Sequence, residues 1–373
     1  MAAAAAAAAA TDVPVAVAPA STDGGGGGGG RTFICYHYPC PDGIGAALAT
    51  FLGLTRTCPP HMSDAEAAAE MRIEFVPLAV FRPEEERVAW AARTLAADDT
   101  VYIVDFSGGL RFIREVASRV ASLVVLDHHK TAAADFDALV PPPATLTAVF
   151  DMARSGTGIA RDYFGLAADS PWLVTKLGSA EAAAACLNVL AYIEDNDLWR
   201  HALPGSKDAA AGLHALHLSY DLPANLPVLR QLAGLSVPAL IAAGAAAREA
   251  EEAVIAAAVT RAVHLRITLP ASSPAATFDA LGVIMPTGEL RSNLGNALVD
   301  AAVARGLPGV GIVAYHEPGL PDAATNIKVS VRAATAGVDT TVMTVAYGGG
   351  GHAAASSCIV PRTTYDSWVV PAT

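Results

Sequence analysis

Short apolar runs alternate with helical-looking stretches in the first half of the chain. Four of them, rich in β-branched residues, are RTFICYHY (31–38), RIEFVPL (72–78), TVYIVDFS (100–107) and SLVVLDHH (122–129). Runs that are apolar almost throughout are typical of parallel strands buried on both faces, with crossover helices between them. The first half therefore predicts an α/β domain built on a parallel sheet.

The second half repeats this pattern on a smaller scale. Residues 206–264 are rich in Ala, Leu and Glu and predict helices that link the two halves of the chain. We expect these helices to contribute packing only. The apolar runs at 263–269, 281–286, 310–316 and 327–333 then alternate with a helical stretch at 292–306. We predict four segments, with a cleft between the two domains: a disordered Ala/Gly-rich tail (1–30), an α/β domain (31–205), a helical linker (206–264) and a smaller α/β domain (265–373).

Acidic residues and histidines follow several of the predicted strands. Because ligands gather at the carboxyl ends of parallel strands, these side chains are the ones to consider first. An Asp after a strand is more often a helix cap or turn former, so the combination matters more than any one residue. Carboxylates and neutral imidazoles together are ligands for divalent cations. The candidates are His37, Asp105, Asp127, His128 and His129, joined by Asp195 after a later apolar stretch.

Charge and cysteine content narrow the classes of function. With 24 Lys and Arg against 36 Asp and Glu, the net charge is −12, which disfavours binding to long duplex nucleic acid. The five cysteines are scattered and form no CxxC pair, which argues against a disulfide framework and favours a reducing compartment. No apolar run is long enough to span a bilayer, so we expect no membrane partner. We expect a cytoplasmic protein, although the Ala-rich N-terminus leaves organelle targeting open.

Five motifs, in order along the chain, resemble those of the DHH phosphoesterase family. They are HYPCPDG (37–43), VDFS (104–107), LDHHKT (126–131), IEDNDLW (193–199) and GGGGHAAASS (348–357). The resemblance covers residues 31 to about 360. The GGGGH element, with IKVSVR upstream, is similar to the DHH-associated C-terminal domain of oligonucleotide and cyclic-dinucleotide phosphodiesterases, and differs from the C-terminal domain of family II pyrophosphatases.

The resemblance implies a hydrolase with two metal ions, usually Mn²⁺, in which a water activated by the ions attacks phosphorus. Mg²⁺, Zn²⁺ and Fe²⁺ are alternatives. By this resemblance Asp105 bridges the ions, Asp127 orients the histidines, and His129 faces the phosphate, so that Asp105, His128 and His129 are catalytic. The implied metal ligands are His128 and Asp195 for one ion and His37 for the other, and Asp42 is retained as a ligand.

The first motif departs from the family pattern H-x-x-x-D-x-D. Here Cys40 and Asp42 follow His37, so one carboxylate is missing and the spacing is one residue shorter. Cys40 either replaces the lost acid as a softer thiolate ligand, which would favour zinc or iron, or is a small buried residue. The number of ions, one or two, depends on this point. Asp197 could also exchange roles with Asp195.

The predicted second domain carries a candidate phosphate-binding element. The amides of Gly349, Gly350 and Gly351 can approach an anion closely, and His352 adds a side-chain donor. Arg332 would pair with a second phosphate or a terminal carboxylate through its planar guanidinium. Trp90, Trp172 and Trp199 lack the interleaved basic residues of a platform for single strands, so we expect them in the core.

These observations predict a metal-dependent phosphoesterase that acts on a small phosphorylated partner. The acidic charge favours a short oligonucleotide, a nucleoside bisphosphate or a cyclic dinucleotide. One alternative is an exopolyphosphatase or pyrophosphatase, which uses the same chemistry. The other is an inactive nucleotide-binding scaffold in which the altered first motif has abolished metal binding. The sequence does not decide between a monomer and a homo-oligomer.

Overall fold

The computed structural model describes residues 30–80, 82–270, 277–317, 322, 325–334 and 338–371. The tail expected over residues 1–30 lies outside these ranges, apart from Gly30. Two compact units divide the chain, the first ending at Ala245 and the second beginning at Ala246. The division falls inside the long helix α11 (Val237–Thr260). Each unit is described below by itself.

The first unit is built on a parallel five-stranded sheet in the order β2-β1-β3-β4-β5. Residues alternate between its two faces: in β1, Ile34 and Tyr36 join the core on one face, and Phe33 and Cys35 join the core on the other. Both faces are covered, which explains the nearly continuous apolar runs. The strands are β1 (Thr32–Tyr38), β2 (Ile73–Ala79), β3 (Thr100–Val104), β4 (Ser122–Asp127) and β5 (Leu146–Phe150).

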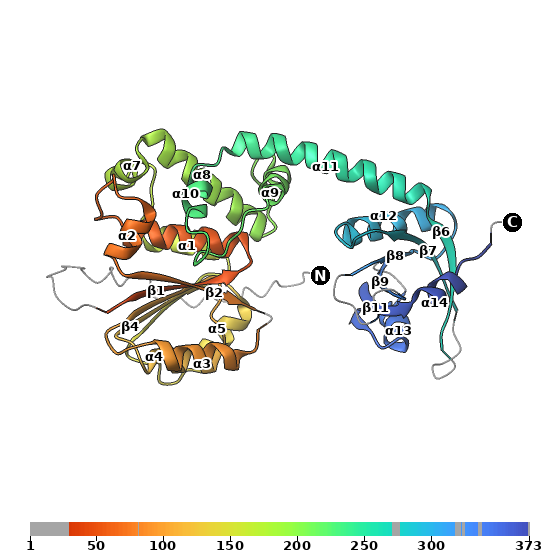
Figure 1. Cartoon of the computed structure of the whole chain (residues 1–373), viewed down its shortest axis with the longest axis horizontal. Helices are drawn as coiled ribbons and strands as arrows, with labels where there is room; N and C mark the ends of the chain where they lie inside the picture. Colours follow the sequence, from red (N-terminus) through yellow and green to blue (C-terminus); the bar gives the residue numbers. More distant parts are fainter. Residues whose placement is uncertain are drawn as a thin grey trace, which may run out of the picture. The chain divides into compact units, whose positions relative to one another are not determined.

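Helices cover both faces of this sheet (Figure 1). One face carries α3 (Glu84–Thr94), α4 (Leu110–Ala117) and α5 (Lys130–Asp137). The other carries α1 (Pro41–Leu54), α2 (Asp64–Glu70), α6 (Gly156–Tyr163), α7 (Pro171–Leu177), α8 (Ala180–Asp197), α9 (Ser206–Ala215) and α10 (Val228–Ala233). Part of the segment expected as a linker therefore belongs to the first unit, because α9 and α10 contact α8.

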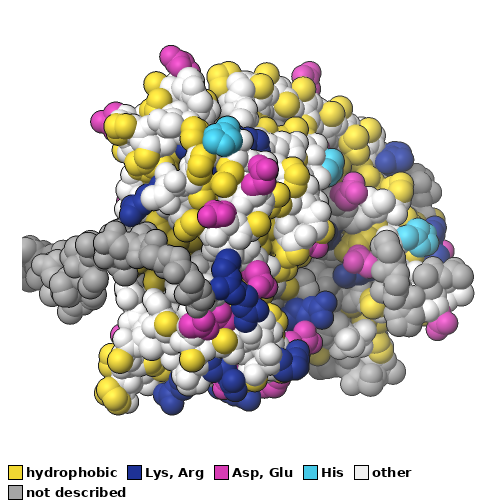
Figure 2. Space-filling view, turned by 60° about the vertical axis from the view of Figure 1, so that its left-hand side comes forward, with side chains coloured by type: hydrophobic (Ala, Val, Ile, Leu, Met, Phe, Trp, Pro, Cys, Tyr) yellow, Lys and Arg dark blue, Asp and Glu magenta, His cyan; other side chains and the backbone are white. Residues whose placement is uncertain are grey.

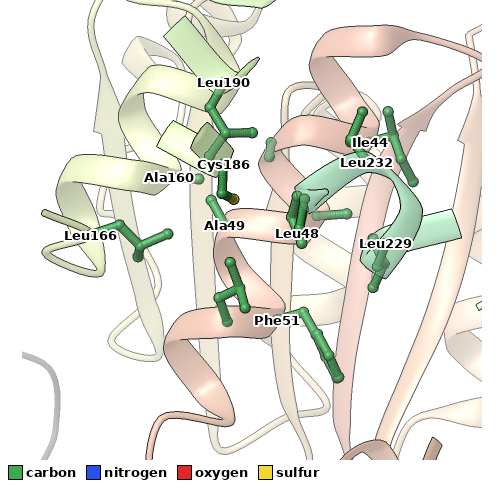
Figure 3. Close-up of a cluster of buried hydrophobic side chains, with 14 of the residues drawn as sticks. Ile44, Leu48, Ala49, Phe51, Ala160, Leu166, Cys186, Leu190, Leu229 and Leu232 are labelled. Atoms are coloured by element: carbon green, nitrogen blue, oxygen red, sulfur yellow. The ribbon is translucent and has the colours of Figure 1, made fainter. Parts of the chain in front are cut away.

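The helix α1 lies at the centre of the larger core, as Figure 3 shows. Its residues 42 to 53 are all buried, so it is apolar on every side and not amphipathic. Leu48 and Phe51 pack among side chains of α6, α8 and α10. Because Asp42 lies in the first turn of the same helix, this packing fixes the position of that carboxylate in the unit.

The second unit contains a mixed six-stranded sheet in the order β10-β11-β9-β8-β7-β6. Only β7 and β8 are parallel, as the other neighbours are antiparallel. The strands are β6 (Val263–Thr268), β7 (Thr277–Met285), β8 (Val310–Tyr315), β9 (Asn326–Ala333), β10 (Gly350–His352) and β11 (Ala355–Pro361). The helices are α12 (Arg291–Ala304), α13 (Thr341–Ala346) and α14 (Arg362–Ser367).

The expected fold class is confirmed: an α/β unit with a parallel sheet is followed by a second α/β unit. One expectation about the core is wrong, because the side chain of Trp199 is 78% exposed. Within the described residues, no one helix has the length and apolarity to cross a bilayer, although α7 and α8 meet that criterion together as a pair bent by 95°.

Candidate metal centre

Three neighbouring strands of the first sheet end at the candidate site. β1, β3 and β4 are adjacent and parallel, so their carboxyl ends lie at the same edge. His37 lies near the end of β1, Asp105 directly follows β3, and His128 directly follows β4. The topology thus brings together side chains that are far apart in the sequence.

Asp105 lies between the two histidines. Its Oδ2 is 3.0 Å from His37 Nδ1, and its Oδ1 is 3.1 Å from His128 Nε2. The side chain is 1% exposed, and its backbone is left-handed, with φ 61°. Burial alone would raise the pKa of Asp105, but the hydrogen bonds with His128 and His37 outweigh it and hold the pKa well below its usual value. The carboxylate is therefore ionised and shared between two donors.

Two further carboxylates approach His128. Its Nε2 lies 3.8 Å from Asp42 Oδ2 and 3.5 Å from Asp197 Oδ2. Asp42 is in the first turn of α1, and Asp197 is the last residue of α8. Each of the three side chains offers one ligand atom, and these atoms lie within 4.8 Å of one another. A cation between them would have two oxygen ligands and one nitrogen ligand.

A second group of donors includes Asp105, which also contacts His128 of the first group. Ligand atoms of His37, Cys40 and Asp105 also lie within 4.8 Å of one another. Burial, followed by the charge of Asp105, raises the pKa of the Cys40 thiol to about 12, so the thiol is protonated at neutral pH in the absence of a cation. Cys40 is thus placed where a ligand would be, and its role as a ligand stays a prediction.

The electrostatics of the cluster fit a divalent cation. Asp42 is 1% exposed, and burial together with the charges of Asp105 and Asp197 raises its pKa well above the usual value. Ligand oxygens of Asp42 and Asp197 lie within 4.8 Å of each other. Two negative charges this close repel strongly at low dielectric, and a divalent cation between them would turn the repulsion into attraction to the cation. Carboxylate and imidazole donors suit Mn²⁺, Fe²⁺ and Zn²⁺. The residues present therefore fit the metal that the motifs imply.

The Asp127 carboxylate holds the two histidines that follow β4 in place through hydrogen bonds. It is fully buried, and its Oδ1 accepts the amide N–H of His128 at 2.7 Å and that of His129 at 3.0 Å. The same oxygen is 2.7 Å from His129 Nδ1, while Oδ2 accepts the amide N–H of Ser107 at 2.8 Å. The bond with Asp127 raises the pKa of His129. This arrangement directs His129 Nε2 away from Asp127.

Asp195, expected as a metal ligand, directs its carboxylate to the backbone after α8 and not to the histidines. It accepts the amide N–H groups of Ala202 at 3.0 Å and Leu203 at 3.2 Å, and so organises the turn after α8. A helix turns about 100° per residue, so side chains two positions apart point in nearly opposite directions. Only one of the two could face the histidines, and it is Asp197 that does so. The alternative in which these two residues exchange roles therefore agrees with the geometry.

Gly156 allows α6 to lie against this centre. A Cβ at this position would be 2.4 Å from Asp105 Cβ, closer than real side chains approach. The amides of Gly156 and Thr157 donate to the Asp42 carboxylate at 2.7 and 3.1 Å. Asp42 thereby accepts two N–H groups at the start of α6 that the helix itself cannot satisfy. None of the motifs considered in the sequence includes these two residues.

In the second unit, the glycine-rich element is a strand at the edge of the sheet and not a loop. In the register of β10, β11 and β9, His352 pairs with Ala355, which pairs with Arg332. Residues in one such row point to the same face, and two strand spacings separate the Cα atoms of His352 and Arg332 by about 10 Å. Arg332 donates to Ser292 Oγ at 3.0 Å, so the face is the one next to α12. Gly350 and Gly351 belong to the edge strand β10, and Gly349 directly precedes it.

Comparison with known proteins gives distant likenesses. No protein-family model matches the chain. Uncharacterized protein R106 of Acanthamoeba polyphaga mimivirus is 23% identical over 189 residues, which are 51% of this chain and 38% of that protein. The match thus spans well under half of the viral protein.

Several solved structures resemble the chain over most of its length. A pGpG-specific phosphodiesterase from Vibrio cholerae has a TM-score of 0.42 and 11% identity, covering 90% of this chain and 95% of that one. An exopolyphosphatase-related protein from Bacteroides fragilis has a TM-score of 0.37 and 10% identity, covering 88% and 86%. The DHH domain of a member of a family of ribosomal proteins has a TM-score of 0.37 and 15% identity, covering 91% and 85%. At these values, none of the likenesses assigns an activity to this chain.

Proposed function

We propose that the chain is a phosphoesterase of the DHH type that hydrolyses small phosphorylated molecules with the help of divalent cations. The observation that carries this proposal is the meeting of Asp42, Asp105, His128 and Asp197 in one cluster, with His37 on its other side. Four separate motifs supply these residues. A fold maintained only as a scaffold has no need to gather like charges in its interior, because their repulsion destabilises it.

Each residue of the cluster has a role in this proposal. Asp105 would be shared between two cations, with His37 on one side and His128 on the other. Asp42 and Asp197 would complete the ligands on the side of His128. Divalent cations held there would act as Lewis acids on the phosphoryl oxygens and lower the pKa of water toward neutrality. Mn²⁺ is our first choice, because oxygen and nitrogen donors predominate.

His129 is the residue that we assign to the phosphate itself. Its Nδ1 is held by Asp127, so Nε2 is the atom that can face a substrate. Because the bond with Asp127 raises its pKa, His129 keeps both ring protons, including the one on Nε2, up to a higher pH than a free histidine does. That proton would stabilise a phosphoryl oxygen or pass to the leaving oxygen. In the second unit, we assign phosphate recognition to Arg332, His352, Gly350 and Gly351 of β10, and the preceding Gly349.

Charge supports a small substrate. The net charge of −12 opposes binding of a long polyanion. On the face drawn in Figure 2, Lys and Arg side chains lie among Asp and Glu side chains and form no unbroken basic stripe. A short oligonucleotide, a nucleoside bisphosphate or a cyclic dinucleotide carries few phosphates and needs no such stripe.

The test is a metal analysis combined with a substrate panel. The purified full chain is assayed on pApA, pAp, cyclic dinucleotides and polyphosphate with Mn²⁺, Mg²⁺ or Zn²⁺, before and after treatment with EDTA. We expect hydrolysis that EDTA abolishes and added cation restores. The variant Asp105→Asn should lose at least about a hundredfold in activity, because a bound metal contributes several kcal/mol to transition-state stabilisation.

A matched variant controls for the loss of one negative charge. Asp98 is exposed, so Asp98→Asn should retain wild-type activity and metal content. Hydrolysis that persists after complete removal of metal, or an Asp105→Asn variant as active as Asp98→Asn, would contradict the proposal.

A further inference from the structure

A pocket opens beside the metal cluster on the side of Asp42 and Asp197. Its volume is about 490 Å³, and both carboxylates are among its lining residues. This is the size of pocket that commonly holds a small organic ligand. The pocket lies wholly within the first unit, between α8, α9 and the start of α11. It therefore gives the helices expected only to link two halves a direct connection to the candidate site.

Much of the pocket wall is apolar, and several hydrogen-bonding side chains lie among the apolar ones. Val189 and Ile193 of α8, Leu213 of α9 and Leu240 of α11 contribute aliphatic surface. A further group of side chains can donate and accept hydrogen bonds or stack on a ring: Asn196, His214, His217 and Tyr220. An amide, two imidazoles and a phenol above an aliphatic wall suit a flat heterocycle better than an alkyl chain.

Charge decides which part of a substrate this pocket can hold. Among the described residues that line it, none is Lys or Arg, and the two charged members are Asp42 and Asp197. A second phosphate placed in this pocket, away from the cations, would meet no Lys or Arg, and an unpaired charge is costly at low dielectric. A neutral organic group meets no such penalty. The pocket thus distinguishes phosphate esters of an organic alcohol from chains of inorganic phosphate.

We propose that this pocket binds the nucleobase of a nucleotide whose phosphate lies at the metal cluster, and that it selects nucleotides over inorganic polyphosphates. The inference rests on the proposed phosphoesterase function. Apolar contact with α8, α9 and α11 supplies the affinity, while Asn196 and the two histidines hold the polar edge of the base. Selectivity therefore depends on the α9 face of the pocket, away from the cluster.

The experiment fills the pocket from α9. Ala210 is a half-buried lining residue, and Ala210→Phe places a ring in the space that the base would occupy. Ala215, at the exposed end of the same helix and outside the lining, provides the matched control Ala215→Phe. The kcat/KM values for pApA and for tripolyphosphate are measured with Mn²⁺ present. We expect Ala210→Phe to lower the ratio of pApA to tripolyphosphate at least tenfold, mainly through KM, and Ala215→Phe to leave it within twofold.

A second variant covers the case in which Ala210→Phe fails to fold. His214 is exposed, so His214→Ala removes a rim contact without disturbing the core, and we expect a three- to tenfold rise in KM for pApA. Wild-type protein that prefers tripolyphosphate, or pocket variants that leave the ratio unchanged, would overturn the proposal. These results differ from a failure of the proposed function, in which no phosphate substrate is hydrolysed and isothermal titration with MnCl₂ detects no binding.

Discussion

The close approach of α6 to Asp105 can be tested by adding a single methyl group. In Gly156→Ala, the new Cβ would lie 2.4 Å from Asp105 Cβ and 2.8 Å from its Oδ1. Carbon atoms pack at about 3.5 Å or more, so helix and carboxylate must separate by about 1 Å. Overpacking of this kind costs about 1–3 kcal/mol of stability. A displacement of about 1 Å in a reacting centre lowers the rate by about a hundredfold.

The assay measures stability and metal affinity separately. Urea unfolding gives the free energy of unfolding, and isothermal titration with MnCl₂ gives the dissociation constant. Metal affinity should fall at least tenfold, because the same shift also withdraws the Gly156 amide from Asp42. Gly234→Ala is the control, since its Cβ would meet nothing closer than 3.4 Å. A Gly156→Ala protein with wild-type Mn²⁺ affinity and stability within about 0.5 kcal/mol of the wild type would refute this reasoning.

The remaining predictions concern the acidic residues and the metal. Asp197→Asn should lose at least tenfold in Mn²⁺ affinity by titration. Asp195→Asn should keep that affinity and lose about 1–3 kcal/mol of stability, because it disrupts a buried carboxylate that accepts two amides. The reverse result would identify Asp195 as the ligand. Although burial alone would raise the pKa of Asp99, hydrogen bonds from Ala96 and Arg31 hold it below the usual value. The free energy of unfolding should therefore fall as the pH drops below about 4. Urea unfolding between pH 6 and 3 should show a smaller fall for Asp99→Asn than for the wild type. Equal falls in the two proteins would contradict this prediction. Finally, Mn²⁺ at a hundred times its dissociation constant should stabilise the protein by about 2.7 kcal/mol, and a melting temperature unaffected by Mn²⁺ or EDTA would exclude a specific site.

Much of the first sheet is predictable from the sequence, because strands buried on both faces leave an unmistakable apolar pattern. β5 escaped prediction, since it has only five residues and every one of them is at least partly exposed. The edge strand β10 was not predicted as a strand for a different reason, because a glycine-rich segment is typical of a loop. It becomes a strand only through pairing with β11.

The candidate site was predictable at the level of motifs and not of individual atoms. His37, Asp105 and His128 follow from strand ends, since parallel topology alone brings such ends together. The choice between Asp195 and Asp197 depends on how the last turn of α8 is rotated, and packing elsewhere in the unit sets that rotation. The pocket residues come from three helices and share no local pattern.

The left-handed backbone at Asp105 limits the ways in which this centre can change during evolution. With φ 61°, the position favours Gly, Asn and Asp, whose side chains tolerate this conformation, over longer or branched residues. Glu would keep the negative charge but strain the end of the strand. A substitution that removes the negative charge and keeps this backbone conformation is therefore one to Asn or Gly.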